Sequence, residues 1–486
     1  MKSYEENYRI ALEFSQGSAE GRLEALRRAV SAQGAQDGMG GAAAHSAQDS
    51  MGGAAAHSAQ GSSGGAAAEF VNNHIHSIYS FSPYSPTAAA YAAKLNGLTT
   101  VGIMDHDSVA GAHEFLEACG IVGIGATVGF ECRVDMGRTP FAGRRINNPD
   151  QDSVAYMACH GIPHHNIGKA QEWLRPYRES RRLRSQLMTE RLNGLLSGTG
   201  LRLSFEGDVA AISQAQGGGV ITERHILFAL ARQIVKAFGR GRGCLDFISK
   251  QLALPLGANA AAALLDAGDP LYEYRMLGTL KAHLVGRFYI DAGAECPDAF
   301  EFLEFASAIG AISAYPYLGD VADSVTGDKT SACFEDGYLD ELIAWLAREG
   351  FNAVTYMPAR NSAGQLERIM RLAGAAGLFQ ISGEDINAPF QPFVCEMLAK
   401  PAFRHLADSA WALIGHEKAA SRIQPDAPGQ PAGTPGAQAG ASQGRADKTG
   451  RLTDAPHGMF SPETIKAWPG LEGRIGYFAK LGRGQI

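Results

Sequence analysis

The chain has 486 residues, with 43 Lys and Arg against 50 Asp and Glu and a formal net charge of −7 at pH 7. This length fits one large barrel as well as two domains, and the negative charge argues against general binding to nucleic acid or an anionic membrane, although it allows a local basic patch. The seven cysteines show no CxxC spacing, which indicates reduced thiols. The chain has neither an apolar signal segment nor a membrane-spanning apolar run. Together these features predict a cytoplasmic protein.

Two segments precede the main body of the chain. Residues 1–34 carry apolar residues at helical spacing, which predicts an N-terminal helical segment. Residues 35–69 hold three tandem twelve-residue units rich in Gly, Ala and Ser, and side chains of this size cannot build a core. Solenoid repeats are longer and carry regular hydrophobic anchors. We therefore expect residues 35–69 to form a flexible, low-complexity linker.

Apolar, β-branched or aromatic runs predict seven strands in the main body. The runs are 70–76, 100–105, 121–132, 153–160, 311–315, 351–356 and 378–382. Helical patterns separate most of them. One helix is expected to start at Ser85-Pro86 and to stop at Asn96-Gly97, and this β-α-β rhythm predicts a parallel sheet.

A long α-rich interval separates the fourth predicted strand from the fifth. It is too long for a simple crossover, so we expect a helical insertion that caps a site. A stretch rich in Pro, Gly and Ala precedes a short C-terminal helix that begins at Ser461-Pro462. The predicted segments of this part are the barrel at 70–163, the insertion at 164–300, the barrel again at 301–423, a disordered linker at 424–456 and a helical segment at 457–486.

The insertion contains a run of arginines beside Trp173 and Tyr177. They are Arg175, Arg178, Arg181, Arg182, Arg184 and Arg191. Such a run can steer an anionic substrate or contact a nucleic-acid backbone. A solvated helix face explains the same pattern equally well. In the same insertion, Thr222 to His225 resembles a helix-capping signature more than a ligand cluster.

Histidines and carboxylates follow the predicted strands. His74 and His76 lie two residues apart, so both imidazoles share one face of a strand, although chance explains such a pair almost as well in a chain with 14 histidines. Four further residues fall at or just beyond other strand ends: His106, Glu131, His160 and Asp385. The carboxyl ends of parallel strands meet at one rim. A mixed set of His and carboxylate ligands there suits Zn²⁺, Mn²⁺ or Fe²⁺.

Four ordered motifs make residues 70–395 resemble the PHP (polymerase and histidinol phosphatase) superfamily of metal-dependent phosphoesterases. The motifs are His74-Ile75-His76-Ser77, Met104-Asp105-His106-Asp107, Gly129-Phe130-Glu131 and Gly383-Glu384-Asp385-Ile386-Asn387. The nearest likeness is to the branch of nucleoside-bisphosphate phosphatases and small exonucleases. The resemblance implies an α/β fold, a distorted (β/α)7 barrel with a helical insertion after the fourth strand and one to three divalent ions at its rim.

The resemblance also implies roles for individual residues. His74, His76, Glu131 and Asp385 match the ligands of the first metal, Glu131 bridges to a second metal with His160, and His106 belongs to a third. The expected catalytic residues are Asp105, Asp107 and Arg360. Arg360 is included because an arginine at the rim can bind a phosphate, although an exposed arginine is often only a solvated charge. Weaker candidates are Tyr315, Asn387, His164 and His165.

The chain departs from the family pattern at three positions. Phe81 replaces the aspartate of a Ser-Asp-Gly motif, Tyr315 replaces the histidine of Ala-His-Pro, and Asn387 replaces the histidine of Asp-x-His. Phenylalanine cannot bind a metal, and tyrosine and asparagine are weaker ligands than imidazole for these ions. We therefore expect a complete first site, a weakened second site and an incomplete third site.

The expected function is that of a phosphoesterase, which hydrolyses a phosphate monoester of a small metabolite or nucleotide with a metal-activated water. One alternative is an exonuclease that trims short nucleic acids. Another is a regulatory metal-binding protein whose catalytic centre has decayed, for which the three replacements are the evidence. We expect no membrane partner, and the sequence leaves the oligomeric state open.

Overall fold

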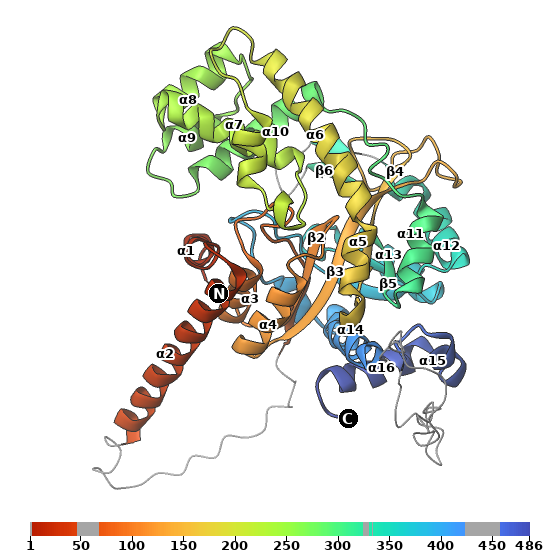
Figure 1. Cartoon of the computed structure of the whole chain (residues 1–486). Coiled ribbons are helices and arrows are strands. Elements are labelled where there is room, and N and C mark those ends of the chain that lie inside the picture. The colour runs from red at the N-terminus through yellow and green to blue at the C-terminus, as the bar shows by residue number, and fades with distance from the viewer. Residues whose placement is uncertain (1, 46–67, 324–329, 333, 423–456) are drawn as a thin grey trace, which may run out of the picture.

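The computed structural model describes residues 2–45, 68–323, 330–332, 334–422 and 457–486. A barrel-shaped sheet lies in the middle of the molecule, the helical insertion lies above it, and the C-terminal helices lie below it (Figure 1). The predicted linker at 424–456 and most of the one at 35–69 fall outside the described residues. Residues 35–45 belong to a helix that begins at Ala19, so regular structure continues past the predicted boundary at residue 34.

All seven predicted strands belong to one mixed sheet that curls into a nearly closed barrel. In spatial order they are β1 (Phe70–Ile75), β2 (Leu98–His106), β3 (Gly125–Asp135), β4 (Val154–His160), β5 (Ile312–Tyr317), β8 (Ala353–Tyr356) and β9 (Phe379–Ser382). A bridge between Ile75 and Ile386 joins β1 to the segment after β9 and so nearly closes the ring. The (β/α) barrel expected from the sequence is thus confirmed. A separate hairpin, β6 (Val321–Asp323) and β7 (Thr330–Ala332), follows β5.

The expectation that all strands run parallel is wrong for β4. This strand is antiparallel to both of its neighbours, β3 and β5, whereas the other pairs in the barrel are parallel. A parallel neighbour requires a crossover, usually a helix, but residues 136–153 between β3 and β4 contain turns and no helix. The chain therefore turns back beside β3. The end of β4 consequently points toward the opposite end of the barrel from the ends of its neighbours.

Helices cover the outside of the barrel. They are α3 (Pro86–Leu95), α4 (Ala112–Val122), α11 (Ala299–Ala308), α12 (Leu339–Glu349) and α13 (Ala363–Ala375). At the start of α3, the Ser85 side chain accepts the N–H of Ala88 and Pro86 occupies the first turn. The helix ends at Asn96, and Gly97 follows with a φ of 85°. The boundaries predicted for this helix are therefore confirmed. Helices α1 (Tyr4–Phe14) and α2 (Ala19–His45) pack against α3 and α4.

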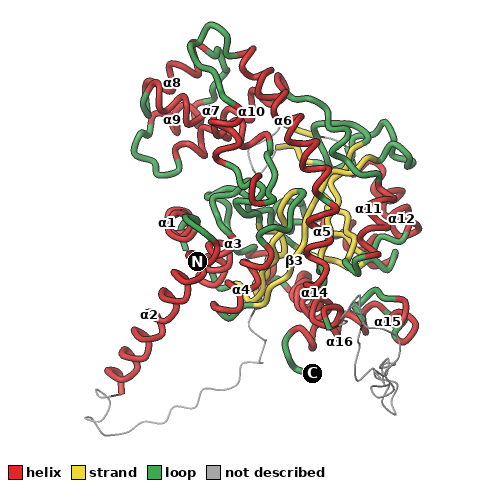
Figure 2. The backbone as a smooth tube through the Cα atoms, in the orientation of Figure 1, coloured by secondary structure: helices red, strands yellow, loops and turns green. Residues whose placement is uncertain are grey.

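The insertion forms a helical layer over one end of the barrel (Figures 1 and 2). Its first helix, α5 (Ile167–Trp173), packs on the outside of the barrel, where Ile167 and Ala170 join the barrel's buried cluster. The following helices of the insertion are α6 (Arg175–Leu195), α7 (Glu223–Phe238), α8 (Arg242–Asp246), α9 (Ala258–Leu265) and α10 (Tyr272–Phe288). It has a hydrophobic cluster of its own, and Phe81 from the loop after β1 belongs to that cluster. The insertion is therefore anchored to the barrel through this loop.

The opposite end of the barrel is closed by helices from the C-terminal part of the chain, α14 (His405–Ser421), α15 (Pro462–Ala467) and α16 (Leu471–Gly482). Residues of α14 and α16 share one buried cluster with Met104, Ala158 and other side chains inside the barrel. None of the described helices combines the length and the apolar character that crossing a membrane requires. With one end covered in this way, polar side chains inside the barrel face the insertion end.

Candidate metal centre

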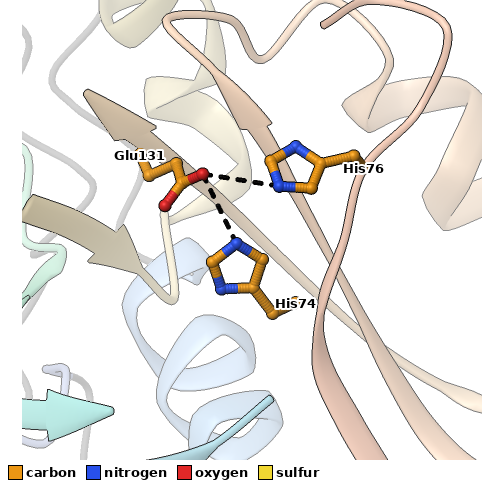
Figure 3. A group of neighbouring side chains, drawn as sticks. All are labelled: His74, His76 and Glu131. Carbon is orange, nitrogen blue, oxygen red and sulfur yellow. Dashed lines mark ion pairs between the residues drawn. The ribbon is translucent and has the colours of Figure 1, made fainter. Parts of the chain in front are cut away.

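The end of β1 presents two imidazoles to the barrel interior. His76 donates its backbone N–H to Ile386 and the carbonyl of His74 accepts the N–H of Ile386, so this segment is held against the chain that follows β9. The side chain of Asn73 adds a hydrogen bond to the carbonyl of Ser382. His74 is 7% exposed and His76 is 1% exposed. Both rings turn toward Glu131 of β3 (Figure 3).

The carboxylate of Glu131 is the centre of the cluster. Its Oε1 lies 3.5 Å from His74 Nε2, 3.4 Å from His76 Nε2 and 2.9 Å from His106 Nδ1. His106 and Glu131 are directly opposite each other in the parallel pair of β2 and β3, which explains why they meet. Among the described residues, the ligand atoms of His74, His76 and Glu131 all lie within 4.8 Å of one another.

Asp385 completes the group from the other side. Its Oδ1 lies 3.2 Å from His76 Nε2, and its side chain is 39% exposed, so the cluster is open to solvent here. Asn387, two residues further on, donates its amide to the same Oδ1 at 2.7 Å. Asn387 thus holds Asp385 in place, while its own Oδ1 is buried without a hydrogen bond.

The donor atoms fit a divalent cation. His74 Nε2, His76 Nε2, His106 Nδ1 and His160 Nε2 are all buried and have no hydrogen-bond partner in the described chain. Buried nitrogens of this kind carry a free-energy cost unless something binds them. Two ligand atoms about 2.1 Å from a tetrahedral ion lie about 3.4 Å apart. The distances of 3.2 to 3.5 Å among His74, His76, Glu131 and Asp385 match this spacing.

The electrostatics of the cluster keep its carboxylates charged. Burial by itself would raise the pKa of Glu131, but the neighbouring His106 and His74 outweigh burial and hold this pKa well below its usual range. Burial likewise opposes the charged form of Asp385, but the ion pair with His76 outweighs burial and brings the pKa of Asp385 below its usual range. For His76, burial lowers the pKa, but Asp385 and Glu131 overcome that effect and raise it to about 10. The site thus attracts positive charge.

His160 reaches the cluster by a different route from the one the sequence suggested. Because β4 is antiparallel, the end of this strand lies toward α14 rather than at the rim. His160 faces inward nonetheless, since it lies two residues from Ala158, which is paired with Glu131. Burial and the nearby charge of His74 lower the pKa of His160 to about 3. Its imidazole is therefore neutral, and it lies below Glu131 inside the barrel.

His164 and His165 do not approach the cluster, which corrects the expectation that they lie near the metals. They follow β4 and therefore lie at the α14 end of the barrel. His164 Nε2 is 3.0 Å from a carboxylate oxygen of Glu417 in α14, and His165 is exposed. The reversal of β4 is the physical reason, because it carries the start of the insertion away from the rim.

Asp105 and Asp107 are each held by other groups. The Asp105 carboxylate accepts hydrogen bonds from the backbone and side chain of Ser77 and from the side chain of Ser80. Asp107 has a φ of 50° and pairs with Arg181 at 2.6 Å. Both are buried. Both carboxylates are therefore already engaged by hydrogen bonds. Neither is free to act on a substrate beside Glu131, as the expected catalytic role requires.

The replaced positions have structural roles. Tyr315 is fully buried and faces the outer helical layer, where its hydroxyl donates to the carboxylate of Glu335. Successive residues of a strand face opposite sides, and Ala314 faces the barrel interior, so Tyr315 faces away from the cluster. The structure therefore does not support Tyr315 as a metal ligand. Phe81 packs against His225, Phe228 and Tyr274 of the insertion.

Arg360 follows β8, and its Nε donates to the carbonyl of Leu318 at 3.1 Å. This hydrogen bond joins the loop after β8 to the loop after β5 and holds the Arg360 side chain at the rim. The other loop contact comes from Asn361, whose amide also donates to Leu318. A phosphate-binding role for Arg360 stays a prediction.

The arginines of the insertion are paired. Arg181 and Arg184 of α6 and Arg133 of β3 are at most 6% exposed and form ion pairs with Glu223 and Glu295. With Asp107 included, three positive and three negative groups form a buried network that joins the insertion to the rim. Arg175 and Arg182 form surface ion pairs, while Arg178 and Arg191 donate to backbone carbonyls. The basic run is therefore largely structural.

Sequence reasoning missed several residues near the cluster. Ser80 connects Asp105 to His76, and Ser77 donates a second hydroxyl to Asp105. Tyr156 lies beside His106, with ring centroids 5.7 Å apart. In the sequence, Ser77 stands only as the end of the first motif and Ser80 only as part of a departure from the family pattern, and the spacing of neither serine to Asp105 indicates a contact. The capping interpretation of Thr222 is confirmed, since His225 accepts the N–H of Thr222 through Nδ1 at the start of α7.

Comparison with known proteins agrees with the motifs. Residues 72–250 match the family model of the PHP domain. This segment of the chain is therefore similar to a PHP domain. No curated protein sequence matches the chain.

Two solved structures resemble the fold, each covering 70% of this chain and 96% of its own. One is described as a candidate metal-dependent phosphoesterase from Bifidobacterium adolescentis, with 19% identity and a TM-score of 0.46. The other is an amidohydrolase from Chromobacterium violaceum with bound sulfate and no metal, with 16% identity and a TM-score of 0.44.

Proposed function

We propose that this protein is a metal-dependent phosphoesterase that hydrolyses a phosphate monoester of a small metabolite or nucleotide. The observation that carries the proposal is the inward-facing set of His74, His76, Glu131 and Asp385, whose donor atoms have the spacing of a metal site. We infer the substrate class from the branch of nucleoside-bisphosphate phosphatases, which the motifs of this chain resemble.

The residues of the chain have distinct tasks in this reaction. A bound divalent ion would polarise the phosphoryl group and lower the pKa of water at the site. Glu131 and Asp385 supply the negative charge that holds such an ion, and the imidazoles hold it without adding charge. Solvent reaches the cluster on the side of Asp385, so we assign the entry of substrate and water to that side. Arg360 would hold the phosphate there as a bidentate donor.

The contacts of the insertion favour a small substrate over a nucleic acid. Binding to a polyanion depends on unpaired Lys and Arg side chains that displace counterions. All six arginines of the basic run have partners within the chain. We therefore expect the affinity for an oligonucleotide to be weak, and the exonuclease alternative loses its main support.

A regulatory protein with a decayed centre is the remaining alternative. It would bind a metal and a phosphate ester without turnover. Phe81 and Tyr315 are built into hydrophobic contacts, so they count as lost ligands. The set of four ligands that includes Glu131 is nevertheless complete, and one bound ion could support the hydrolysis, although less well than a pair of ions. We propose one firmly bound ion and a weaker second one next to His160.

Elemental analysis combined with hydrolysis assays tests the proposal. Purified wild type should hold about one Zn²⁺, Mn²⁺ or Fe²⁺ ion per chain and release phosphate from mononucleotides or bisphosphates. His76→Ala should lose both the ion and the activity, whereas the exposed His113→Ala in α4 should keep both. Metal in the wild type without turnover of any phosphate ester would favour the regulatory protein. Cleavage of oligonucleotides that weakens steeply with salt would favour the exonuclease.

A further inference from the structure

A chain of hydrogen bonds lies behind His76, on the side away from the other ligands. His76 Nδ1 is 3.1 Å from Ser80 Oγ, and Ser80 Oγ is 2.7 Å from Asp105 Oδ1. The same carboxylate accepts the backbone N–H and the hydroxyl of Ser77, each at 2.6 Å. His76, Ser80 and Asp105 are each at most 1% exposed, so bulk water does not compete for these bonds.

The single hydroxyl proton of Ser80 decides which ring nitrogen of His76 carries hydrogen. A carboxylate accepts hydrogen bonds and cannot donate them. If Ser80 gave its proton to His76, two oxygen lone pairs would face each other at 2.7 Å across Ser80 and Asp105. Ser80 must therefore donate to Asp105. Its oxygen then accepts a hydrogen bond, and His76 Nδ1–H is the donor that the described residues place within reach.

This arrangement prepares His76 Nε2 for a metal. With hydrogen on Nδ1, the neutral ring has its lone pair on Nε2, which lies 3.4 Å from Glu131 Oε1 and 3.2 Å from Asp385 Oδ1. A doubly protonated ring keeps the same Nδ1–H bond to Ser80. Groups behind a ligating histidine often set its tautomer in this way.

We infer that Ser80 and Asp105 are positioning residues that keep hydrogen on His76 Nδ1 and direct Nε2 toward Glu131 and Asp385. The consequence for metal binding rests on the proposed function. Asp105 thus acts through Ser80 and His76, without contact with substrate. This role differs from the catalytic one expected for Asp105 from the sequence.

The first test is nitrogen NMR of histidine-labelled wild type without metal and with zinc. We expect the ¹⁵N shift of His76 Nδ1 to be that of a protonated nitrogen from pH 6 to pH 9 in both samples. A shift typical of an unprotonated Nδ1 would overturn the inference. This measurement needs no variant, so a folding defect cannot obscure it.

The second test measures zinc affinity by competition with a chromophoric chelator. Ser80→Ala removes the acceptor and should weaken zinc binding by about 10- to 100-fold, the usual effect of losing such a partner. Ser108→Ala is the matched control, because Ser108 is equally buried but donates to the carbonyl of Gly218. Equal affinities for the two variants would overturn the inference.

Variants of Asp105 show whether its carboxylate acts as a hydrogen-bond acceptor for Ser80 or only fills space behind His76. Asp105→Asn keeps an oxygen that can accept from Ser77 N–H and Ser80, so it should retain the Nδ1–H signal and most of the zinc affinity. Asp105→Ala removes the acceptor and should behave like Ser80→Ala. Loss of the Nδ1–H signal in Asp105→Asn but not in Asp105→Ala would contradict the assigned role.

The two proposals can fail separately. A wild type that shows hydrogen on His76 Nδ1 but binds none of Zn²⁺, Mn²⁺ and Fe²⁺ would disprove the proposed function and leave the tautomer assignment intact. A wild type that binds zinc and hydrolyses phosphate esters with an unprotonated Nδ1 would disprove only the positioning role.

Discussion

At the scale of single residues, one carboxylate oxygen organises the cluster. Glu131 Oε1 lies within 3.5 Å of nitrogens from three histidines that come from two different strands. Without a central negative charge, these buried imidazoles would face one another. In the proposed function, Glu131 therefore contributes both a ligand and the negative charge that allows the imidazoles to gather around it.

Replacing this carboxylate with an amide should abolish metal binding. Glu131→Gln removes the charge and leaves an amide among the imidazoles, so we expect metal affinity to fall by more than about 100-fold, beyond the loss typical for outer partners. Chelator competition measures the change. Glu384→Gln is the control, because Glu384 accepts the N–H of Ala359 and an amide oxygen can do the same. An unchanged affinity in Glu131→Gln would refute the central role.

Phe81 shows how a lost ligand position can gain a structural role. The side chain is 7% exposed and touches three aromatic rings of the insertion. Phe81→Ala should therefore lower the free energy of unfolding by about 3 kcal/mol, at the low end for a buried phenylalanine. Metal content should stay the same because Phe81 is not a ligand.

Urea unfolding and elemental analysis check this prediction together. Phe81→Leu keeps most of the volume and should cost less than about 1.5 kcal/mol. A change in bound metal in either variant would mean that Phe81 lies closer to the ions than its contacts indicate.

At the scale of elements, a buried network of charges joins the insertion to the barrel. Glu295 precedes α11 and accepts hydrogen bonds from Arg133 of β3 at 2.9 Å and from Arg184 of α6 at 2.6 and 2.8 Å. The network holds α6 over the rim in one position. The insertion is thus part of the wall of the site and is anchored by charge as well as by apolar contacts.

Removing one charge from this network should be costly. In Glu295→Gln, Arg133 and Arg184 lose a buried partner, and we expect the free energy of unfolding to fall by about 3 to 5 kcal/mol. Denaturant unfolding measures the loss, and limited proteolysis should cut within the insertion first. Glu190→Gln breaks an exposed pair with Arg202 and should cost less than about 1 kcal/mol. Equal costs for the two variants would contradict a structural role of the network.

At the scale of the whole molecule, the two ends of the barrel serve different purposes. The insertion end holds the titratable ligand cluster, and the other end is sealed by α14 and the C-terminal segment. His416 of α14 is 2% exposed, donates through Nε2 to the carbonyl of Gly310 and accepts the N–H of Met459 at Nδ1. One neutral imidazole thus connects three distant parts of the chain.

This imidazole should make the protein sensitive to acid. Burial lowers the pKa of His416 to about 4, below the value near 6.5 of an unfolded histidine. The unfolded chain therefore binds more protons between these pH values, and the contribution of His416 is fully present above pH 6.5 and is lost as the pH falls toward 4. The loss amounts to about 3 kcal/mol at most.

Urea unfolding at several pH values between 7.5 and 4.5 measures this effect. His416→Gln should be less stable than wild type at pH 7.5, and the difference should shrink as the pH falls. Parallel stability curves for the two proteins would show that His416 does not titrate in this way.

The sequence by itself determined the local features of this protein. Apolar, β-branched or aromatic runs identified seven strands, a serine and a proline marked the start of α3, and the spacing of His74 and His76 placed both on one face of a strand. These features depend on neighbours within a few residues. For this reason, the strands and the shared face of His74 and His76 were predictable from the residues themselves, whereas the barrel and the metal ligands were implied by the resemblance of four motifs to the PHP superfamily.

Only the tertiary structure decided which distant groups meet. The direction of β4 depends on what connects it to β3, and that reversal moves His164 and His165 away from the cluster. The basic run is paired because Glu295, more than a hundred residues along the chain, folds back onto Arg184. Ser80 and Asp105 meet behind His76 for the same reason. Pairings of this kind depend on three-dimensional packing, which residue spacing does not encode.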